Sequence, residues 1–184
     1  MPDGGSPVPL PAGVVLRLLR ADDGPALAAA YTRDRARLEP WEPTRPENFF
    51  TADGQADAVR TTLREHDAGR CAPFVLEHAG RVVGRVTLSD VVGGAFCNAH
   101  LGYWLAGSVT GRGVMTAAVE ATLEHARDAL GLHRVQAATL AHNAPSQAVL
   151  VRTGFERIGF APRYLRIAGR WQDHVLFQRI LHDG

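Results

Sequence analysis

Hydrophobic and polar residues recur with helical spacing at some places in the chain and alternate at others, and this change outlines the fold. An apolar run at residues 14–19 is typical of a buried strand, and a helix capped by Asp22 or Asp23 is expected to follow it. A surface helix is predicted over residues 55–68, where apolar positions recur among charged ones. Between these helices, repeated Pro at 38–46 predicts a loop with the character of a functional loop or lid.

The middle of the chain has a period of two, which indicates strands. Three antiparallel strands are expected at residues 73–77, 81–89 and 96–105, because glycine-containing turns separate them. The strongest helical pattern follows, with apolar residues on one face from Met115 to Leu130. The remaining elements expected are a strand at 133–140, a short helix at 143–154, and strands at 155–160, 164–167 and 171–181. This order predicts an α+β (mixed α/β) fold whose sheet carries helices on both faces.

Composition adds the domain organisation to this picture. A chain of 184 residues is long enough for one core, so a single domain is expected over residues 14–184. Residues 1–13 contain four Pro and three Gly and are expected to form a mobile tail. The balance of 46% hydrophobic and 21% charged residues favours neither disorder nor a membrane protein.

Charge and cysteine content narrow the possible partners. The net charge is only +1, so neither a nucleic acid nor a membrane is expected as a partner, although a local basic patch stays possible. Every basic residue is Arg, which excludes a Lys nucleophile and a Walker-type phosphate loop. Cys71 and Cys97 form no CxxC pair, which fits a reducing cytoplasm. The eight His show no compact metal-binding spacing, so no metal is predicted.

The segment Thr-Gly-Arg-Gly-Val-Met-Thr at 110–116 has the pattern of a phosphate site. It lies between an apolar strand and the longest predicted helix. Free amides at a helix start attract anions, and Gly lets a phosphate approach the backbone, while an ordinary tight turn is the alternative. Thr116 stands where a dinucleotide-binding fingerprint has a third Gly or Ala, and antiparallel strands precede the turn. A nucleotide-bearing ligand other than NAD is therefore favoured.

Four further segments, together with this turn, carry a family resemblance. They are His-Leu-Gly-Tyr-Trp-Leu at 100–105, Gly-Leu-His-Arg-Val at 131–135, Asn-Ala-Pro-Ser-Gln-Ala-Val-Leu at 143–150 with Gly154-Phe155, and Gly-Arg-Trp-Gln-Asp-His at 169–174. In this order and spacing the chain resembles the GCN5-related N-acetyltransferase (GNAT) superfamily, and within it the RimJ/RimL-like branch of ribosomal-protein N-terminal acetyltransferases. The resemblance runs from about Val14 to Leu181. Thr110 and Met115 depart from the superfamily pattern, but the phosphate contacts there come mainly from the backbone.

The resemblance implies a bacterial enzyme that uses acetyl-CoA as co-substrate. It also implies a mostly antiparallel, twisted sheet of about six to seven strands, splayed in the middle, where the pantetheine arm lies between the strands near 96–105 and 134–140 and the pyrophosphate rests on the glycine turn. The residues expected to hold acetyl-CoA are Tyr103, Trp104, Leu105, Thr110, Gly111, Arg112, Gly113, Val114, Met115, Thr116, Asn143 and Ser146.

Direct transfer of the acetyl group needs a base for the amine and a donor for the departing thiolate. By resemblance, Ser146 is the candidate donor; as a residue at a helix start it can equally bond the backbone. Asn143 fits a cap that orients the cofactor better than a catalyst. His100 is the candidate base, because imidazole titrates near neutral pH, and a structural His is the alternative. Glu42 in the Pro-rich loop is a second candidate base.

The acceptor is the part of the reaction that the sequence defines least. The resemblance implies the N-terminal α-amino group of a protein, with a ribosomal protein as the leading candidate, and the residues expected to bind it are Trp41, Tyr103, Trp171, Asp173 and His174. Asp173 and His174 are equally consistent with a structural hydrogen-bonded pair. The alternatives are a small amine such as an amino acid or antibiotic, or a non-catalytic acyl-CoA-binding module. The protein is expected in the cytoplasm, and a homodimer is one oligomeric state that the sequence leaves open.

Overall fold

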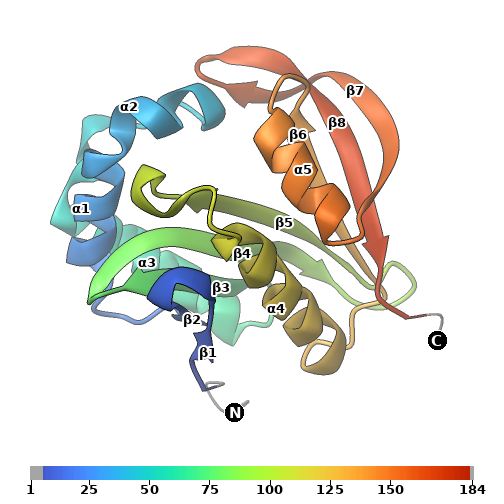
Figure 1. Ribbon diagram of the computed structural model, residues 1–184, viewed down its shortest axis with the longest axis horizontal. Coiled ribbons are helices and arrows are strands. Elements are labelled where there is room, and N and C mark those ends of the chain that lie inside the picture. The colour runs from blue at the N-terminus through green and yellow to red at the C-terminus, as the bar shows by residue number, and fades with distance from the viewer. Residues whose placement is uncertain (1–5, 183–184) are drawn as a thin grey trace.

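A computed structural model describes residues 6–182 as one eight-stranded sheet with helices on both faces (Figure 1). The strand order is β1-β2-β3-β4-β5-β6-β8-β7, and only β5 and β6 pair in parallel. The strands are β1 (Val8–Pro9), β2 (Val14–Leu18), β3 (Ala72–His78), β4 (Arg81–Val92), β5 (Asn98–Leu105), β6 (Arg134–Leu140), β7 (Glu156–Ile167) and β8 (Arg170–Ile180). The predicted mixed α/β class is confirmed, with eight strands in place of six or seven.

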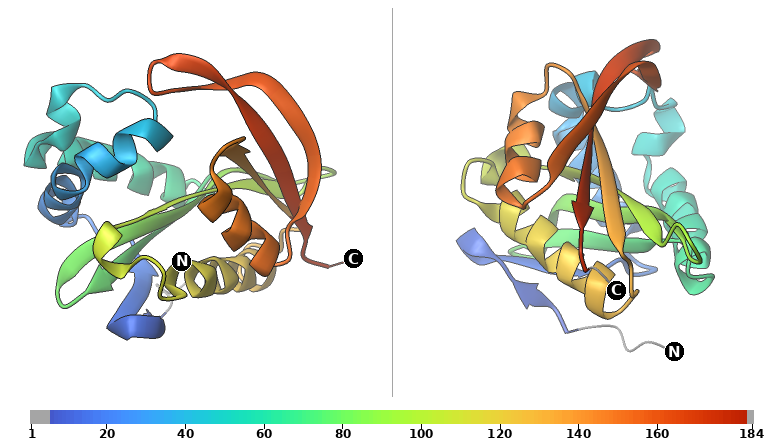
Figure 2. Two further views of the ribbon diagram at one scale, coloured as in Figure 1. Left: turned by 45° about the horizontal axis from the view of Figure 1, so that its top comes forward. Right: turned by 90° about the vertical axis from the view of Figure 1, so that its right-hand side faces the viewer.

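The helices divide between the two faces of the sheet. They are α1 (Gly24–Arg33), α2 (Arg35–Leu38), α3 (Ala52–Asp67), α4 (Val114–Asp128) and α5 (Ala144–Arg152). Helices α1 and α3 lie on one face, and α4 and α5 lie on the opposite face (Figure 2). Short 3₁₀ helices occur at Pro11–Gly13, Glu39–Trp41, Glu47–Phe50 and Gly107–Val109.

The core follows the hydrophobic pattern. In α4 the buried residues recur three and four positions apart, so one face of the helix packs against the sheet. They are Val114, Met115, Ala118, Val119, Thr122, Leu123 and Ala126. Strand β3 has buried residues on both of its faces, as expected for a strand with helices on either side.

The chain differs from the expected tail between residue 6 and β2. Residues 1–5 of that tail lie outside the described residues. Val8 and Pro9, however, pair with Leu16 and Val15, and the amide of Leu10 donates to the carbonyl of Val14 at 2.8 Å. Pro fits here because an edge strand leaves one side of its backbone unpaired. A short edge strand therefore forms without the longer run of apolar side chains that predicts strands elsewhere.

Two predicted boundaries also change. The strands expected at 155–160 and 164–167 are one strand, β7, whose pairing with β8 is irregular between Ala161 and Leu165. Pro162 lies in this interval and has no amide hydrogen for the ladder, which explains why the sequence suggested a break. Helix α3 begins at Ala52, because the Thr51 hydroxyl caps it by accepting the Gly54 amide at 3.1 Å.

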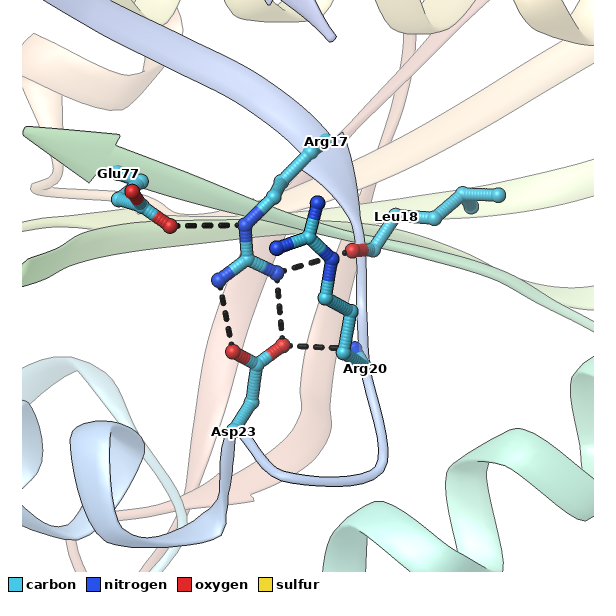
Figure 3. Close-up of polar contacts among 5 residues, drawn as sticks. All are labelled: Arg17, Leu18, Arg20, Asp23 and Glu77. Carbon is cyan, nitrogen blue, oxygen red and sulfur yellow. Dashed lines mark hydrogen bonds and ion pairs between the residues drawn. The ribbon is translucent and has the colours of Figure 1, made fainter. Parts of the chain in front are cut away.

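Asp23 precedes α1, but its side chain does not cap the helix as predicted. Its two carboxylate oxygens accept hydrogen bonds from the buried Arg17 guanidinium at 2.8 and 2.7 Å, and one of them also accepts the Arg20 amide at 2.7 Å (Figure 3). Arg17 also donates to Glu77 of β3 at 2.8 Å. Burial raises the pKa of Asp23, but the hydrogen bonds from Arg17 and Arg20 outweigh it and hold that pKa below its usual value. The Asp23 carboxylate therefore binds the Arg17 guanidinium instead of capping α1.

Candidate active site

The sheet opens between its two parallel strands. β5 and β6 pair only from Asn98 to His100, opposite Arg134 to Gln136. Beyond His100, β5 pairs with β4 alone and β6 with β8 alone. The edge of β5 from Leu101 to Leu105 therefore has no strand partner on the side of β6 among the described residues, and a cavity of about 1000 Å³ has three residues of this strand, Tyr103 to Leu105, in its wall. This is the splay that the resemblance implies.

The glycine turn and the start of α4 form another wall of this cavity. Gly111 and Gly113 both have φ of 75°, which favours glycine, and Gly113 is the N-cap of α4. A Cβ atom at either glycine would meet no atom within 4 Å. No side chain caps this helix start and its first turn has no acidic residue, so its free amides are available to an anion. These features fit the pyrophosphate of CoA.

The start of α5 faces β5 across the cavity. The Asn143 side-chain oxygen accepts the Ser146 amide at 3.2 Å, which confirms the predicted cap. The Tyr103 hydroxyl lies 2.9 Å from Ser146 Oγ and 3.0 Å from the Ser146 carbonyl oxygen. Burial raises the pKa of Tyr103 to about 12, against the opposing hydrogen bond to Ser146, so its hydroxyl stays protonated and can donate. Ser146 thus lies at a helix start and in the cavity wall at once.

Trp104 points to the face of β5 opposite to that of Tyr103, where it contacts Tyr31 of α1. Its indole N–H donates to the Tyr31 hydroxyl at 2.8 Å, and burial together with the charge of Glu42 raises the pKa of Tyr31. Glu42 directly follows Trp41, another residue of the cavity wall. Burial also raises the pKa of Glu42, although Arg45 and Arg85 oppose this shift. A mostly buried carboxylate therefore lies beside the end of the cavity near Trp41 and Trp104.

The loop that carries Glu42 is fixed to the far hairpin. The Glu42 carbonyl accepts the amide of Ala168 at 2.9 Å, and the Trp41 ring lies 5.4 Å from that of His142. Ala168 is in the predicted turn between β7 and β8. The Pro-rich loop and the hairpin tip thus meet beside the cavity, as a lid-forming loop would require.

Six predicted residues are not among those that line the cavity: Glu42, His100, Arg112, Trp171, Asp173 and His174. His100 lies on β5 where that strand still pairs with β6, and its Nδ1 is 3.7 Å from Asp90 Oδ2. Asp173 and His174 do not bond each other. Asp173 accepts the Arg163 amide at 2.8 Å, and the buried His174 contacts the Gln172 carbonyl through Nδ1 at 2.9 Å. Trp171 is 62% exposed on the hairpin.

The predicted cofactor residues, by contrast, meet in one place. All of them line the cavity except Arg112, and Trp41 lines it as well. The lining residues that the sequence did not indicate are Arg37, Leu38, Ala117, Glu120, Pro145, Ala148, Val149 and Arg152. Helical spacing could have found those on α4 and α5, since Glu120 and Arg152 continue the faces of Thr116 and Pro145. Arg37 had no signal, because the sequence does not predict α2, whereas Leu38 belongs to the Pro-rich segment predicted as a functional loop.

Neither a metal centre nor a membrane span emerges from the part of the chain that the structure describes. Residues 6–182 contain no group of three or more His, Cys, Asp or Glu side chains that could hold a metal ion. Over the same residues, no helix has the length and apolar character that crossing a membrane requires.

Residues 14–156 match the family model described as acetyltransferase (GNAT) domain. The chain therefore belongs to the GNAT family of acetyltransferases, and it is an N-acetyltransferase with that family's fold. Among curated proteins, it is 34% identical over 165 residues to the ribosomal protein uS5-alanine N-acetyltransferase of Escherichia coli K12, covering 89% of this chain and 85% of the relative.

Two solved structures are similar over nearly the whole fold. One is a ribosomal-protein-S5-alanine acetyltransferase from Vibrio fischeri, with 31% identity, a TM-score of 0.92, and 97% and 98% of the two chains covered. The other is Mycobacterium smegmatis RimJ in complex with CoA-disulfide, with 37% identity, a TM-score of 0.89, and 95% of this chain and 86% of that chain covered.

Proposed function

We propose that this enzyme transfers the acetyl group of acetyl-CoA to the N-terminal α-amino group of a protein, most specifically a ribosomal protein that begins with Ala. The observation that carries this proposal is the cavity between the splayed strands, which joins a helix start with free amides to a wall that includes Trp41 of the Pro-rich loop. The names of the relatives at 34% and 31% identity support the acceptor. A ribosomal-protein acceptor also supports action in the cytoplasm.

Acetyl-CoA would be held by the residues that line the cavity. The amides of Val114 to Thr116 and the turn at Gly111 and Gly113 suit its pyrophosphate, and the unpaired edge of β5 offers backbone groups for its pantetheine arm. When bound, acetyl-CoA supplies an activated thioester. The chain's contribution is to place an amine beside it, which removes much of the barrier without a covalent enzyme intermediate.

Two side chains then assist the transfer, one as a base for the amine and the other as a hydrogen-bond donor to the leaving thiolate. Glu42 takes a proton from the incoming ammonium group, directly or through water, and its raised pKa makes it a stronger base than an exposed Glu. Ser146 donates a hydrogen bond to the departing sulfur. Tyr103 supports this role, because its protonated hydroxyl can donate to Ser146 Oγ at 2.9 Å and leave the Ser146 proton free for the cavity.

The geometry favours Glu42 over His100 as the base. His100 lies four residues before Trp104 along β5, about 13 Å at the rise of an extended strand, in the part of the sheet that has not yet opened. Glu42 does not line the cavity either, but it directly follows Trp41, which does. The catalytic role of His100 stays a prediction that its position does not support.

The proposed acceptor is tested by measuring CoA release with two panels of amines. One panel holds peptides of about ten residues that start with Ala, Ser, Met or Pro, each with an Nα-blocked copy as control; the other holds amino acids and aminoglycosides. We expect turnover with free N-termini, highest for Ala. Activity confined to small amines would overturn the protein acceptor, and binding of acetyl-CoA without turnover in either panel would indicate a non-catalytic module.

A further inference from the structure

The β7–β8 hairpin carries a local concentration of positive charge. Residues 157–170 contain four Arg and no Asp or Glu, whereas the whole chain has 20 basic and 19 acidic residues. The four are Arg157, Arg163, Arg166 and Arg170, and all are exposed. In Figure 1 the hairpin lies at the upper right of the molecule, at the end of the sheet.

These four guanidinium groups have no carboxylate partner among residues 6–182. Eight other Arg form ion pairs with Asp or Glu, and all eight come before α5 in the chain. On the hairpin, Arg166 donates through Nε only to the Gly169 carbonyl at 3.1 Å. Unpaired like charges repel one another, and an anionic partner removes that repulsion.

Two exposed aromatic residues lie between these Arg in the chain, and a third directly follows Arg170. Phe160 is 49% exposed, Tyr164 41% and Trp171 62%. Strand β7 is the outermost strand of the sheet, and Ile167 is the one buried residue of its 12. Such a strand gains little from burial. Its composition instead suits a partner that offers both phosphates for Arg and unstacked bases for aromatic rings.

We propose that the β7–β8 hairpin is an RNA-docking surface. Arg binds phosphate with two parallel hydrogen bonds, and aromatic side chains on an open strand stack on the bases of single-stranded loops. A second copy of this chain fits less well, because an isologous contact through β7 would bring the three Arg of this strand against the same three of the partner. The net charge of +1 hides this surface, since only two of the 19 acidic residues, Glu156 and Asp173, lie on the hairpin strands.

The position of the hairpin connects docking to the reaction. The amide of Ala168 at its tip bonds the carbonyl of Glu42, so the surface adjoins the loop beside the cavity. An acceptor N-terminus that projects from an RNA-containing particle would reach the cavity while the particle's RNA contacts the hairpin. This last step rests on the proposed protein acceptor, whereas RNA binding does not.

The test compares two variants with equal loss of charge. Arg163→Gln/Arg166→Gln changes the hairpin, and Arg64→Gln/Arg81→Gln changes two exposed Arg that also lack carboxylate partners among the described residues. Fluorescence anisotropy is measured with a labelled stem–loop RNA of about 20 nucleotides over a series of salt concentrations. We expect the hairpin variant to bind about tenfold more weakly and to lower the slope of log affinity against log salt by about 1.5. The control variant should bind within about twofold of the unchanged protein.

Three results would overturn the inference: equal losses in both variants, tighter binding of a polyglutamate of matched charge, or a dimer in light scattering that Arg163→Gln/Arg166→Gln alters. Acetylation of free peptides is measured in parallel and should be unchanged in both variants. If no peptide is acetylated while RNA binding depends on the hairpin, the proposed acceptor fails and the docking surface stands. If peptides are acetylated and no RNA is bound, the docking surface fails alone.

Discussion

At the scale of single residues, the reaction depends on where a base with a suitable pKa lies. Replacing Glu42 by Gln keeps the size of the side chain and removes the base, so we expect kcat/KM to fall about 100-fold with little change in acetyl-CoA binding. Because burial raises the pKa of Glu42, the acid limb of the pH–rate profile should lie above about pH 4.3 and disappear in the variant. Steady-state kinetics from pH 4 to 9 would check this.

His100→Ala is the matched comparison for this experiment. We expect it to retain activity within about threefold, since His100 lies where β5 still pairs with β6, before the sheet opens into the cavity. A large loss of activity in His100→Ala, together with normal activity in Glu42→Gln, would instead assign the role of the base to His100. The sequence named both candidates and could not rank them, because the ranking depends on the splay of β5 from β6, which no local pattern encodes.

Ser146 is another residue whose role the sequence alone leaves open. The sequence left it between a helix-start residue and a donor, and the structure gives it both kinds of contact, through Asn143 and Tyr103. We expect Ser146→Ala to lower kcat by at least about tenfold while the KM for acetyl-CoA changes little, because its donor role belongs to the transition state. A rise in the KM for acetyl-CoA without a fall in kcat would mean that Ser146 only positions the co-substrate.

At the scale of elements, the turn into α4 combines backbone conformation with an open anion site. Gly113→Ala places a side chain at φ of 75°, at a cost of about 1 kcal/mol, and projects a Cβ toward the cavity. Gly131→Ala is a suitable control, because Gly131 also has a positive φ, of 60°, and open space around it, but lies outside the cavity wall. We expect similar losses of stability in both variants and weaker CoA binding, by about tenfold, only in Gly113→Ala.

Calorimetry of CoA binding and thermal unfolding separates these two effects. Equal affinities of the two glycine variants for CoA would mean that the turn before α4 does not contribute to CoA binding. The element itself was predictable, since apolar spacing in α4 and two glycines before it are local signals. β1 and α2 were not, because an edge strand of two residues and a helix of four are held by neighbours rather than by their own sequence.

At the scale of the whole molecule, the Arg17, Asp23 and Glu77 cluster joins β2, the segment before α1, and β3. Replacing Asp23 by Asn leaves the buried Arg17 with Glu77 as its one carboxylate partner, so we expect a loss of about 3–5 kcal/mol in the free energy of unfolding. Asp57→Asn is the control, because Asp57 pairs with Arg60 on the surface and should cost less than about 1 kcal/mol. Urea unfolding followed by circular dichroism gives both values.

The pH dependence of this difference identifies the charge of Asp23 as its cause. The folded pKa of Asp23 lies below its unfolded value of about 3.9, so the charged form is favoured by folding. The stabilisation is therefore fully present above that unfolded value and is lost as the pH falls through the folded one. We expect the gap between the protein and Asp23→Asn to stay constant from pH 6 to 8 and to shrink below about pH 4. A gap that persists at low pH would mean that packing, rather than the ion pair, links the start of α1 to the sheet.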